Sequence, residues 1–136
     1  MAPTPAAAAG QLQADLVAPG SRITFPRPGT RRRVRALAGV AGPDRSDLRG
    51  VEVALAQRVG TLCRFRRADG RLEAPGPCRT PRFLPARASG GAWLMGLRRD
   101  LAPGLWRVWS RATDGAGNRE SVGIAGVNTL QFRVVR

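Results

Sequence analysis

Three residues in the last third of the chain place an aromatic ring between two cations. Arg107, Trp109 and Arg111 alternate along the run LWRVWSRAT, and side chains two apart on a strand share one face. An indole between two guanidiniums could stack on a base or a sugar while the arginines hold a phosphate or a carboxylate. The alternative is a solvated sheet face, on which the arginines stack on Trp109 and pair with Glu52 of a neighbouring strand. Both interpretations stay open at this point.

The residue types that the chain lacks exclude much of catalytic chemistry. The sequence has no histidine, no tyrosine and no lysine. It therefore offers no imidazole base, no Ser-His-Asp or Cys-His arrangement, no lysine Schiff base and no histidine metal ligand. Carboxylate pairs such as Asp44 and Asp47 fall in a predicted turn with no pocket-forming feature nearby. We expect a protein that is not an enzyme and needs no cofactor.

The weak metal candidates are Asp114 and Asn118 in the sequence DGAGN. Their oxygens could serve Ca²⁺ together with carboxylates of the turn at 43–47, but calcium needs six to eight oxygen ligands. The alternative is that both side chains bond the turn backbone, while Gly115 and Gly117 adopt positive φ. Because the strongly positive net charge also opposes a divalent cation, we expect no metal site.

The two cysteines, Cys63 and Cys78, are separated by a segment rich in Gly and Pro that would let their sulfurs meet. Their spacing is not a CxxC motif, and two thiols without histidine do not complete a zinc site. The sequence therefore predicts a disulfide, with two unpaired thiols as the alternative. A disulfide would place the protein in an oxidising compartment.

The charge of the chain comes entirely from arginine. All 23 basic residues are arginine, and with 9 carboxylates the net charge is +14. Such a surface attracts polyanions without specificity, although abundant Arg, Ala, Gly and Pro without lysine is also typical of a GC-rich genome. The basic runs Arg31 to Arg33 and Arg64, Arg66 and Arg67 accompany no known nucleic-acid motif. Charge that protects strand edges from aggregation explains these runs equally well.

The elements that must position these residues are predicted to be strands. From about residue 33 onward the chain consists of short alternating runs separated by Gly- and Pro-rich turns, without a helical stripe. About seven strands at this spacing predict an all-β fold, an antiparallel two-sheet sandwich. On the strand 105–112, Arg107 and Trp109 are expected to face outward. The side chains expected to face inward are Val53, Leu55, Trp93, Trp106, Val108, Ala112 and Phe132.

The sequence resembles a known family, most clearly in its last third. The run LAPGLWRVWSRATDGAGNRES, followed by a final Leu-x-Phe-x-Val strand, is similar to the last two strands of bacterial immunoglobulin-like (fibronectin type III-like) extracellular domains. The resemblance extends over most of residues 22–135. It departs from the family in Trp106, where tyrosine is more usual, and in a cysteine pair that lies mid-domain instead of bridging two sheets. The family implies an immunoglobulin-like sandwich and a spacer or adhesion role. The matching positions are Pro103, Gly104, Trp106, Ala112, Thr113, Asp114, Ala116, Gly117 and Asn118.

The domain organisation predicted from composition is a tail and one domain. Residues 1–18 form an Ala/Pro-rich tail or linker with a short strand pattern at Leu12, Ala14 and Leu16, and residues 19–136 form the immunoglobulin-like domain. The short pattern is either the first strand of its own domain or an assembly strand that adds to a neighbouring copy and builds a filament. No run approaches about 20 apolar residues, so we expect no transmembrane segment. The start also lacks the features of a secretory signal, so an exported protein would be seen here after trimming or as an excerpt of a longer chain.

These observations favour a non-catalytic exported module. We expect it at the cell surface or outside the cell, in adhesion or in an extracellular assembly that includes filaments, with protein partners or further copies of itself. The alternative is an arginine-rich polyanion-binding protein that acts on nucleic acid or on an acidic wall glycan.

Overall fold

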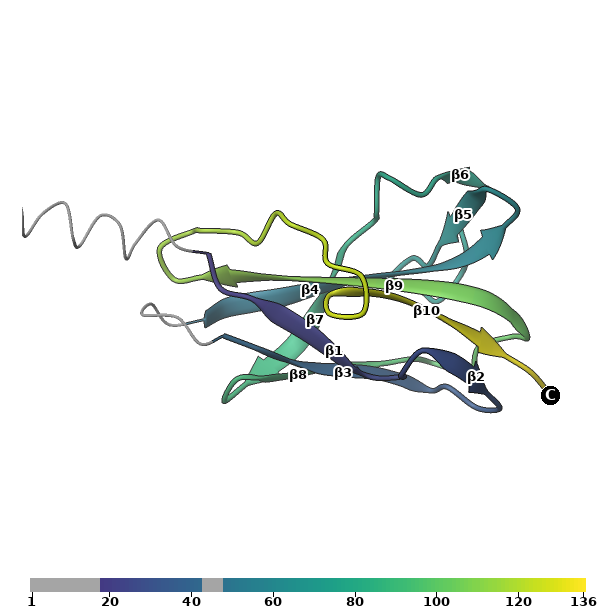
Figure 1. Ribbon diagram of the computed structural model, residues 1–136, viewed down its shortest axis with the longest axis horizontal. Coiled ribbons are helices and arrows are strands. Elements are labelled where there is room, and N and C mark those ends of the chain that lie inside the picture. The colour runs from purple at the N-terminus through teal and green to yellow at the C-terminus, as the bar shows by residue number, and fades with distance from the viewer. Residues whose placement is uncertain (1–17, 43–47) are drawn as a thin grey trace, which may run out of the picture.

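The computed structural model describes residues 18–42 and 48–136 as strands joined by turns and loops (Figure 1). The described residues form ten strands, and none of them belongs to a helix long and apolar enough to cross a membrane. The strands are β1 (Ser21–Phe25), β2 (Gly29–Arg31), β3 (Ala36–Ala41), β4 (Leu48–Val59), β5 (Leu62–Phe65), β6 (Gly76–Pro77), β7 (Leu84–Ser89), β8 (Ala92–Gly96), β9 (Gly104–Asp114) and β10 (Thr129–Val134).

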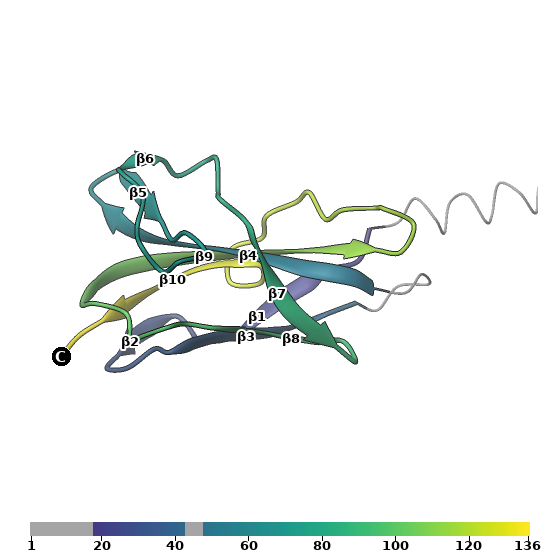
Figure 2. The ribbon, with the colours of Figure 1, turned by 180° about the vertical axis from the view of Figure 1, so that it is seen from behind.

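The ten strands form one mixed sheet, in the order β1-β3-β8-β7-β4-β9-β10-β2, and β5 and β6 extend from β4. The sheet is curled into a half-barrel, so that β1, β3 and β8 lie opposite β4, β9 and β10 (Figure 1 and Figure 2). The predicted all-β class is confirmed. The predicted antiparallel immunoglobulin-like sandwich of two sheets and about seven strands is wrong, because the hydrogen-bonded path runs through the whole structure without a break.

Strand β7 is the reason that the sheet does not split. Its first half pairs with β4, from Leu84 opposite Val53 to Ala86 opposite Val51. Its second half pairs with β8, where Arg87 lies opposite Leu94. A single strand therefore hydrogen-bonds to both halves of the curled sheet. The segment after Cys78 thus contains a strand, Leu84–Ser89, that the alternation pattern did not reveal.

Prolines between β1 and β2 explain why the sheet is mixed. Strand β1 pairs antiparallel with β3, but Pro26 and Pro28 have no N–H to donate and interrupt the strand. The chain then crosses to the opposite end of the sheet, where β2 pairs parallel with β10. Strands β1 and β2 follow each other in the sequence but lie at the two opposite ends of the strand order. Of these two, β2 runs parallel to its neighbour.

The main core lies between the two halves of the curled sheet. Gly39 on β3 is required there, because a Cβ atom at this position would collide with the Trp93 ring and with the Arg22 carbonyl. All seven side chains predicted to face inward are buried, which confirms the predicted alternation. The buried members of this core are Ile23, Val34, Leu37, Val51, Val53, Leu55, Trp93, Met95, Leu97, Trp106, Val108, Ala112, Leu130, Phe132 and Val134.

A second, smaller cluster lies on the other face of β4 and β9. Strands β5 and β6 lie over this face, on the side away from β3 and β8 (Figure 1 and Figure 2). Trp109 belongs to the cluster and is only 8% exposed. Its side chain points away from the main core, as predicted, but the face is covered rather than solvated. The cluster consists of Ala54, Ala56, Cys63, Phe65 and Trp109, with Cys78 and Phe83 packed against it.

Candidate functional site

A disulfide positions one wall of the candidate site. Cys63 on β5 is bonded to Cys78, which follows β6, as predicted. Phe83, further along the same crossover, packs against the small cluster with Cys78. The segment 78–83 is therefore tied to the outer face of β4 and β9, and it carries Arg79 to that face.

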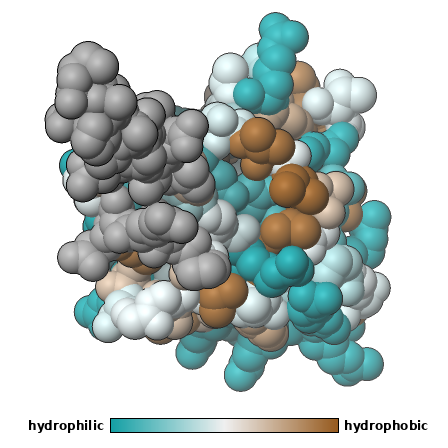
Figure 3. All heavy atoms as spheres, turned by 60° about the vertical axis from the view of Figure 1, so that its left-hand side comes forward, coloured by the Kyte–Doolittle hydropathy of each residue, from teal (hydrophilic) through white to brown (hydrophobic). Residues whose placement is uncertain are grey.

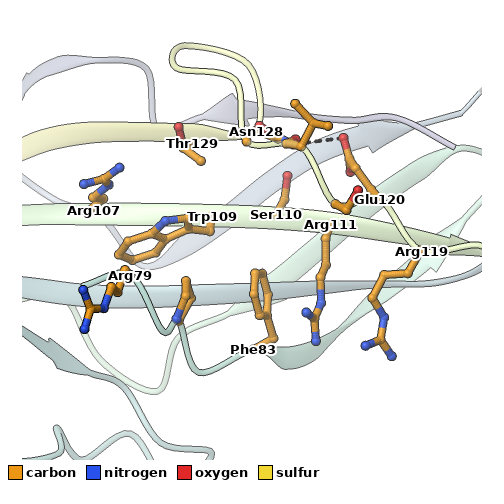
Figure 4. A pocket seen from close by; sticks show the side chains of 14 residues that line it. Arg79, Phe83, Arg107, Trp109, Ser110, Arg111, Arg119, Glu120, Asn128 and Thr129 are labelled. Carbon is orange, nitrogen blue, oxygen red and sulfur yellow. Dashed lines mark hydrogen bonds between the residues drawn. The ribbon is translucent and has the colours of Figure 1, made fainter. Parts of the chain in front are cut away.

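The outer face of β9 is hollowed into a groove of about 540 Å³. We call it the arginine groove and define it by Arg79, Phe83, Arg107, Trp109, Arg111 and Arg119, which line it with neighbouring residues of the crossover and of the segment 119–129. Arg79 and Arg107 lie at one end, Arg111 and Arg119 lie at the other, and the two rings lie between them (Figure 4). The three residues predicted as a binding surface are thus brought together with three that were not predicted.

The aromatic rings of the groove hold guanidiniums in place. The Arg107 guanidinium carbon lies 5.0 Å from the centroid of the Trp109 ring. That of Arg111 lies 3.8 Å from the centroid of the Phe83 ring. Phe65 packs against Trp109 with ring centroids 5.3 Å apart. Trp109 is therefore enclosed, and the groove presents oriented N–H donors rather than an open stacking platform.

Glu52 neutralises only one end of the groove. Its Oε1 atom lies 2.9 Å from Arg111 Nε and 4.0 Å from Arg119 Nε. Arg107 stacks on Trp109 and Arg111 pairs with Glu52. These are the contacts expected if the arginines only cover the face of the sheet and bind no ligand. Among the described residues, however, no carboxylate lies within 4.0 Å of the guanidinium nitrogens of Arg79 or Arg107. That end of the groove keeps two cations available for an anion.

Glu120 also lines the groove, but its carboxylate is used inside the protein. It accepts hydrogen bonds from the backbone N–H and the hydroxyl of Ser21, at 3.1 and 2.6 Å. It accepts two more from the Ala112 N–H at 3.1 Å and from Asn128 Nδ2 at 2.9 Å (Figure 4). This network ties the segment after β9 to β1 and to β9. The Glu120 carboxylate therefore stabilises the wall of the groove through hydrogen bonds within the protein.

The weak metal candidates bond each other. Asp114 is fully buried, and its two carboxylate oxygens accept the backbone N–H of Asn118 at 2.8 Å and its Nδ2 at 3.1 Å. Gly117 has a positive φ of 92°, as expected for the turn, whereas Gly115 is not among the glycines with positive φ. Within the described ranges, no group of three or more metal-ligating side chains gathers. Asp44 and Asp47 lie outside the described residues.

The other predicted residues do not join the groove. Arg33 and Arg35 both pair with Asp100, at 3.1 Å, and Arg64 donates to the Glu73 carbonyl at 2.9 Å. The proposed assembly strand at Leu12, Ala14 and Leu16 lies outside the described residues. The face of the molecule in Figure 3 is largely hydrophilic where it is not drawn in grey, and several hydrophobic side chains gather near its centre.

Sequence reasoning missed Arg79, Phe83 and Arg119 because they lie outside the strand that carries Arg107 and Trp109. Arg79 directly follows Cys78. The predicted disulfide therefore indicated that Arg79 lies near β5, and this was the one signal in the sequence for its position. Arg119 follows the turn of the DGAGN hairpin and carries no periodic signal. Comparison of the chain with known protein families and with curated proteins gave no match.

Proposed function

We propose that the chain is a non-catalytic adhesion module of an exported protein, and that it binds an acidic glycan in the arginine groove. The observation that carries this proposal is the end of the groove formed by Arg79 and Arg107. Neither has a carboxylate partner among the described side chains, and Arg107 is oriented by the Trp109 ring. Guanidiniums held in this way bind carboxylates through charge-assisted hydrogen bonds.

Two observations support an exported protein. The Cys63–Cys78 disulfide is a bond that persists in oxidising compartments. The sequence of β9 and the hairpin after it resembles bacterial extracellular modules, which act as spacers and in adhesion. Both features suit a module that presents a surface outside the cell.

The enclosure of Trp109 argues against a ligand that is held by stacking, such as the bases of a single-stranded nucleic acid. Proteins that bind single strands stack successive bases on exposed aromatic rings. In this groove Trp109 is 8% exposed, and the Arg111 guanidinium lies over the Phe83 ring. The groove therefore recognises anionic groups by charge and hydrogen bonding, as the carboxylates of an acidic glycan require.

The test measures binding of a polygalacturonate oligomer to the full chain by calorimetry, with the neutral methyl-esterified oligomer for comparison. We expect the acidic oligomer to bind and the ester to fail. The double variant Arg79→Gln/Arg107→Gln should bind at least about tenfold more weakly, since each hydrogen bond to a charged group is worth about 1.5 kcal/mol or more.

A matched control separates the groove from general charge. Arg22→Gln/Arg133→Gln removes two exposed arginines outside the groove and should weaken binding less than about threefold. Equal losses in both double variants would overturn the groove as the site. Tighter binding of a short DNA duplex that depends on Arg79 and Arg107 would overturn the glycan in favour of nucleic acid.

A further inference from the structure

A second hollow, separate from the arginine groove, surrounds Arg66. We call it the Arg66 hollow. It has a volume of about 600 Å³ and lies between the turn 66–72 and the connection from β8 to β9. It shares no lining residue with the arginine groove. Gly70 lies in the turn 66–72 with a positive φ of 89°, a backbone conformation that favours glycine.

The Arg66 side chain is largely buried, and none of the described side chains pairs with its guanidinium. The residue is only 8% exposed, and its backbone N–H donates to the Leu55 carbonyl at 2.8 Å. Within the described part of the chain, its guanidinium makes no hydrogen bond and no salt bridge to another side chain. Burial lowers the pKa of Arg66, the neighbouring Arg98 lowers it further, and Asp69 opposes these effects in part. The guanidinium nitrogens of Arg66 are not fully buried, so the charged group reaches the hollow, where the neighbouring charge of Arg98 favours binding of an anion.

Two carboxylates, Asp69 and Asp100, line the hollow together with the arginines, and both accept contacts from other groups. Asp100 lies 3.1 Å from both Arg33 and Arg35, which draw it toward the segment before β3. Asp69 accepts the backbone N–H of Arg71 at 2.9 Å. Residues 18–42 and 48–136 therefore supply no hydrogen-bond acceptor for the Arg66 guanidinium, and an external anion would fill this role.

The walls of the hollow specify more than charge. Leu72, Leu97, Leu101 and Trp106 line it beside Arg66 and Arg98, so an apolar surface adjoins the cations. Small-molecule sites typically combine apolar walls with a few polar groups that fix orientation. We propose that the Arg66 hollow binds the carboxylate of a ligand with an apolar body, with the carboxylate on Arg66 and Arg98 and the body against the leucines. Two sources share this chemistry, a free organic acid and the C-terminal carboxylate of a peptide.

The experiment uses the full chain and follows thermal unfolding and calorimetry with defined probes. Phenylacetate represents the free acid, and phenylacetamide is its neutral control. A tripeptide that ends in phenylalanine represents the peptide carboxylate, and its C-terminal amide is the control. We expect at least one carboxylate to raise the melting temperature, because a ligand that binds only the folded state stabilises it, and both amides to leave it unchanged.

Variants assign the binding to the hollow. Arg66→Met replaces the guanidinium of a largely buried side chain with an apolar group of similar length, so we expect the variant to fold with nearly unchanged stability and to bind the carboxylate at least about tenfold more weakly. Arg98→Gln, at an exposed position, should weaken binding as well. Arg22→Gln on β1 lies outside the hollow and should change binding less than about twofold.

The outcomes separate the two sources and test the site. Binding of phenylacetate identifies a free acid, and binding of the free tripeptide alone identifies a peptide C-terminus. Binding of sulfate with no preference for either carboxylate would overturn the role of the apolar wall. Equal binding by the wild type and both hollow variants, or no binding of any carboxylate, would overturn the proposal without touching the groove, which polygalacturonate tests separately.

Discussion

Asp114 is a buried carboxylate, and hydrogen bonds from the turn that follows it stabilise its negative charge. Burial raises the pKa of Asp114, but hydrogen bonds from the backbone and side chain of Asn118 and from the N–H groups of Ala116 and Gly117 outweigh it, so the pKa lies below its ordinary value of 3.8. A lowered pKa stabilises the folded state at pH values above the ordinary pKa. This stabilisation is lost as the pH falls through the folded-state pKa.

We therefore expect Asp114→Asn to lower the free energy of unfolding at pH 7, with a difference from the wild type that shrinks as the pH falls below about 4. Urea denaturation at a series of pH values measures this difference. Asn118→Ala should show the same trend with a smaller effect, because the backbone N–H groups still bond the carboxylate. A difference that is independent of pH would contradict the assigned role of the charge.

At the scale of elements, the crossover from β6 to β7 depends on the Cys63–Cys78 bond. The crossover packs on the outer cluster through Cys78 and Phe83 and contributes Arg79 to the groove. The double variant Cys63→Ala/Cys78→Ala should lose about 3 kcal/mol of unfolding free energy, since the bond closes a loop of 15 residues. Urea denaturation monitored by circular dichroism measures the loss.

Thr80→Ala serves as a control within the same crossover. It removes only an exposed hydrogen bond of 3.3 Å to the Pro77 carbonyl and should cost less than about 0.5 kcal/mol. If the double cysteine variant were as stable as Thr80→Ala, the disulfide would not be what ties the crossover to the sheet.

At the scale of the whole molecule, the continuous sheet predicts that both halves unfold together. Trp93 reports on β8, and Trp106 and Trp109 report on β9, on opposite sides of β7. In Trp93→Phe, and separately in Trp106→Phe/Trp109→Phe, the fluorescence transition should coincide with that of circular dichroism. A Trp93 transition that is displaced from the circular dichroism transition would show that the halves unfold independently and that β7 does not couple them.

Much of the local structure could be predicted from the sequence. Alternation placed Val53, Leu55 and Phe132 in the core and turned Trp109 to the opposite face, because side-chain direction along a strand depends only on local order. The cysteine pair was also predicted correctly, since the disulfide follows from the chemistry of the residues themselves.

Only the tertiary structure decided which strands are neighbours and what covers each face. The pairing of β7 with both β4 and β8, and the parallel β2, depend on the path of the chain between distant segments, which alternation does not encode. The same path covers Trp109, carries Arg79 to Arg107, and leaves Arg66 buried beside Arg98. The sequence by itself determined the faces of the strands and the disulfide, whereas the groove, the hollow and the single curled sheet arise from long-range packing.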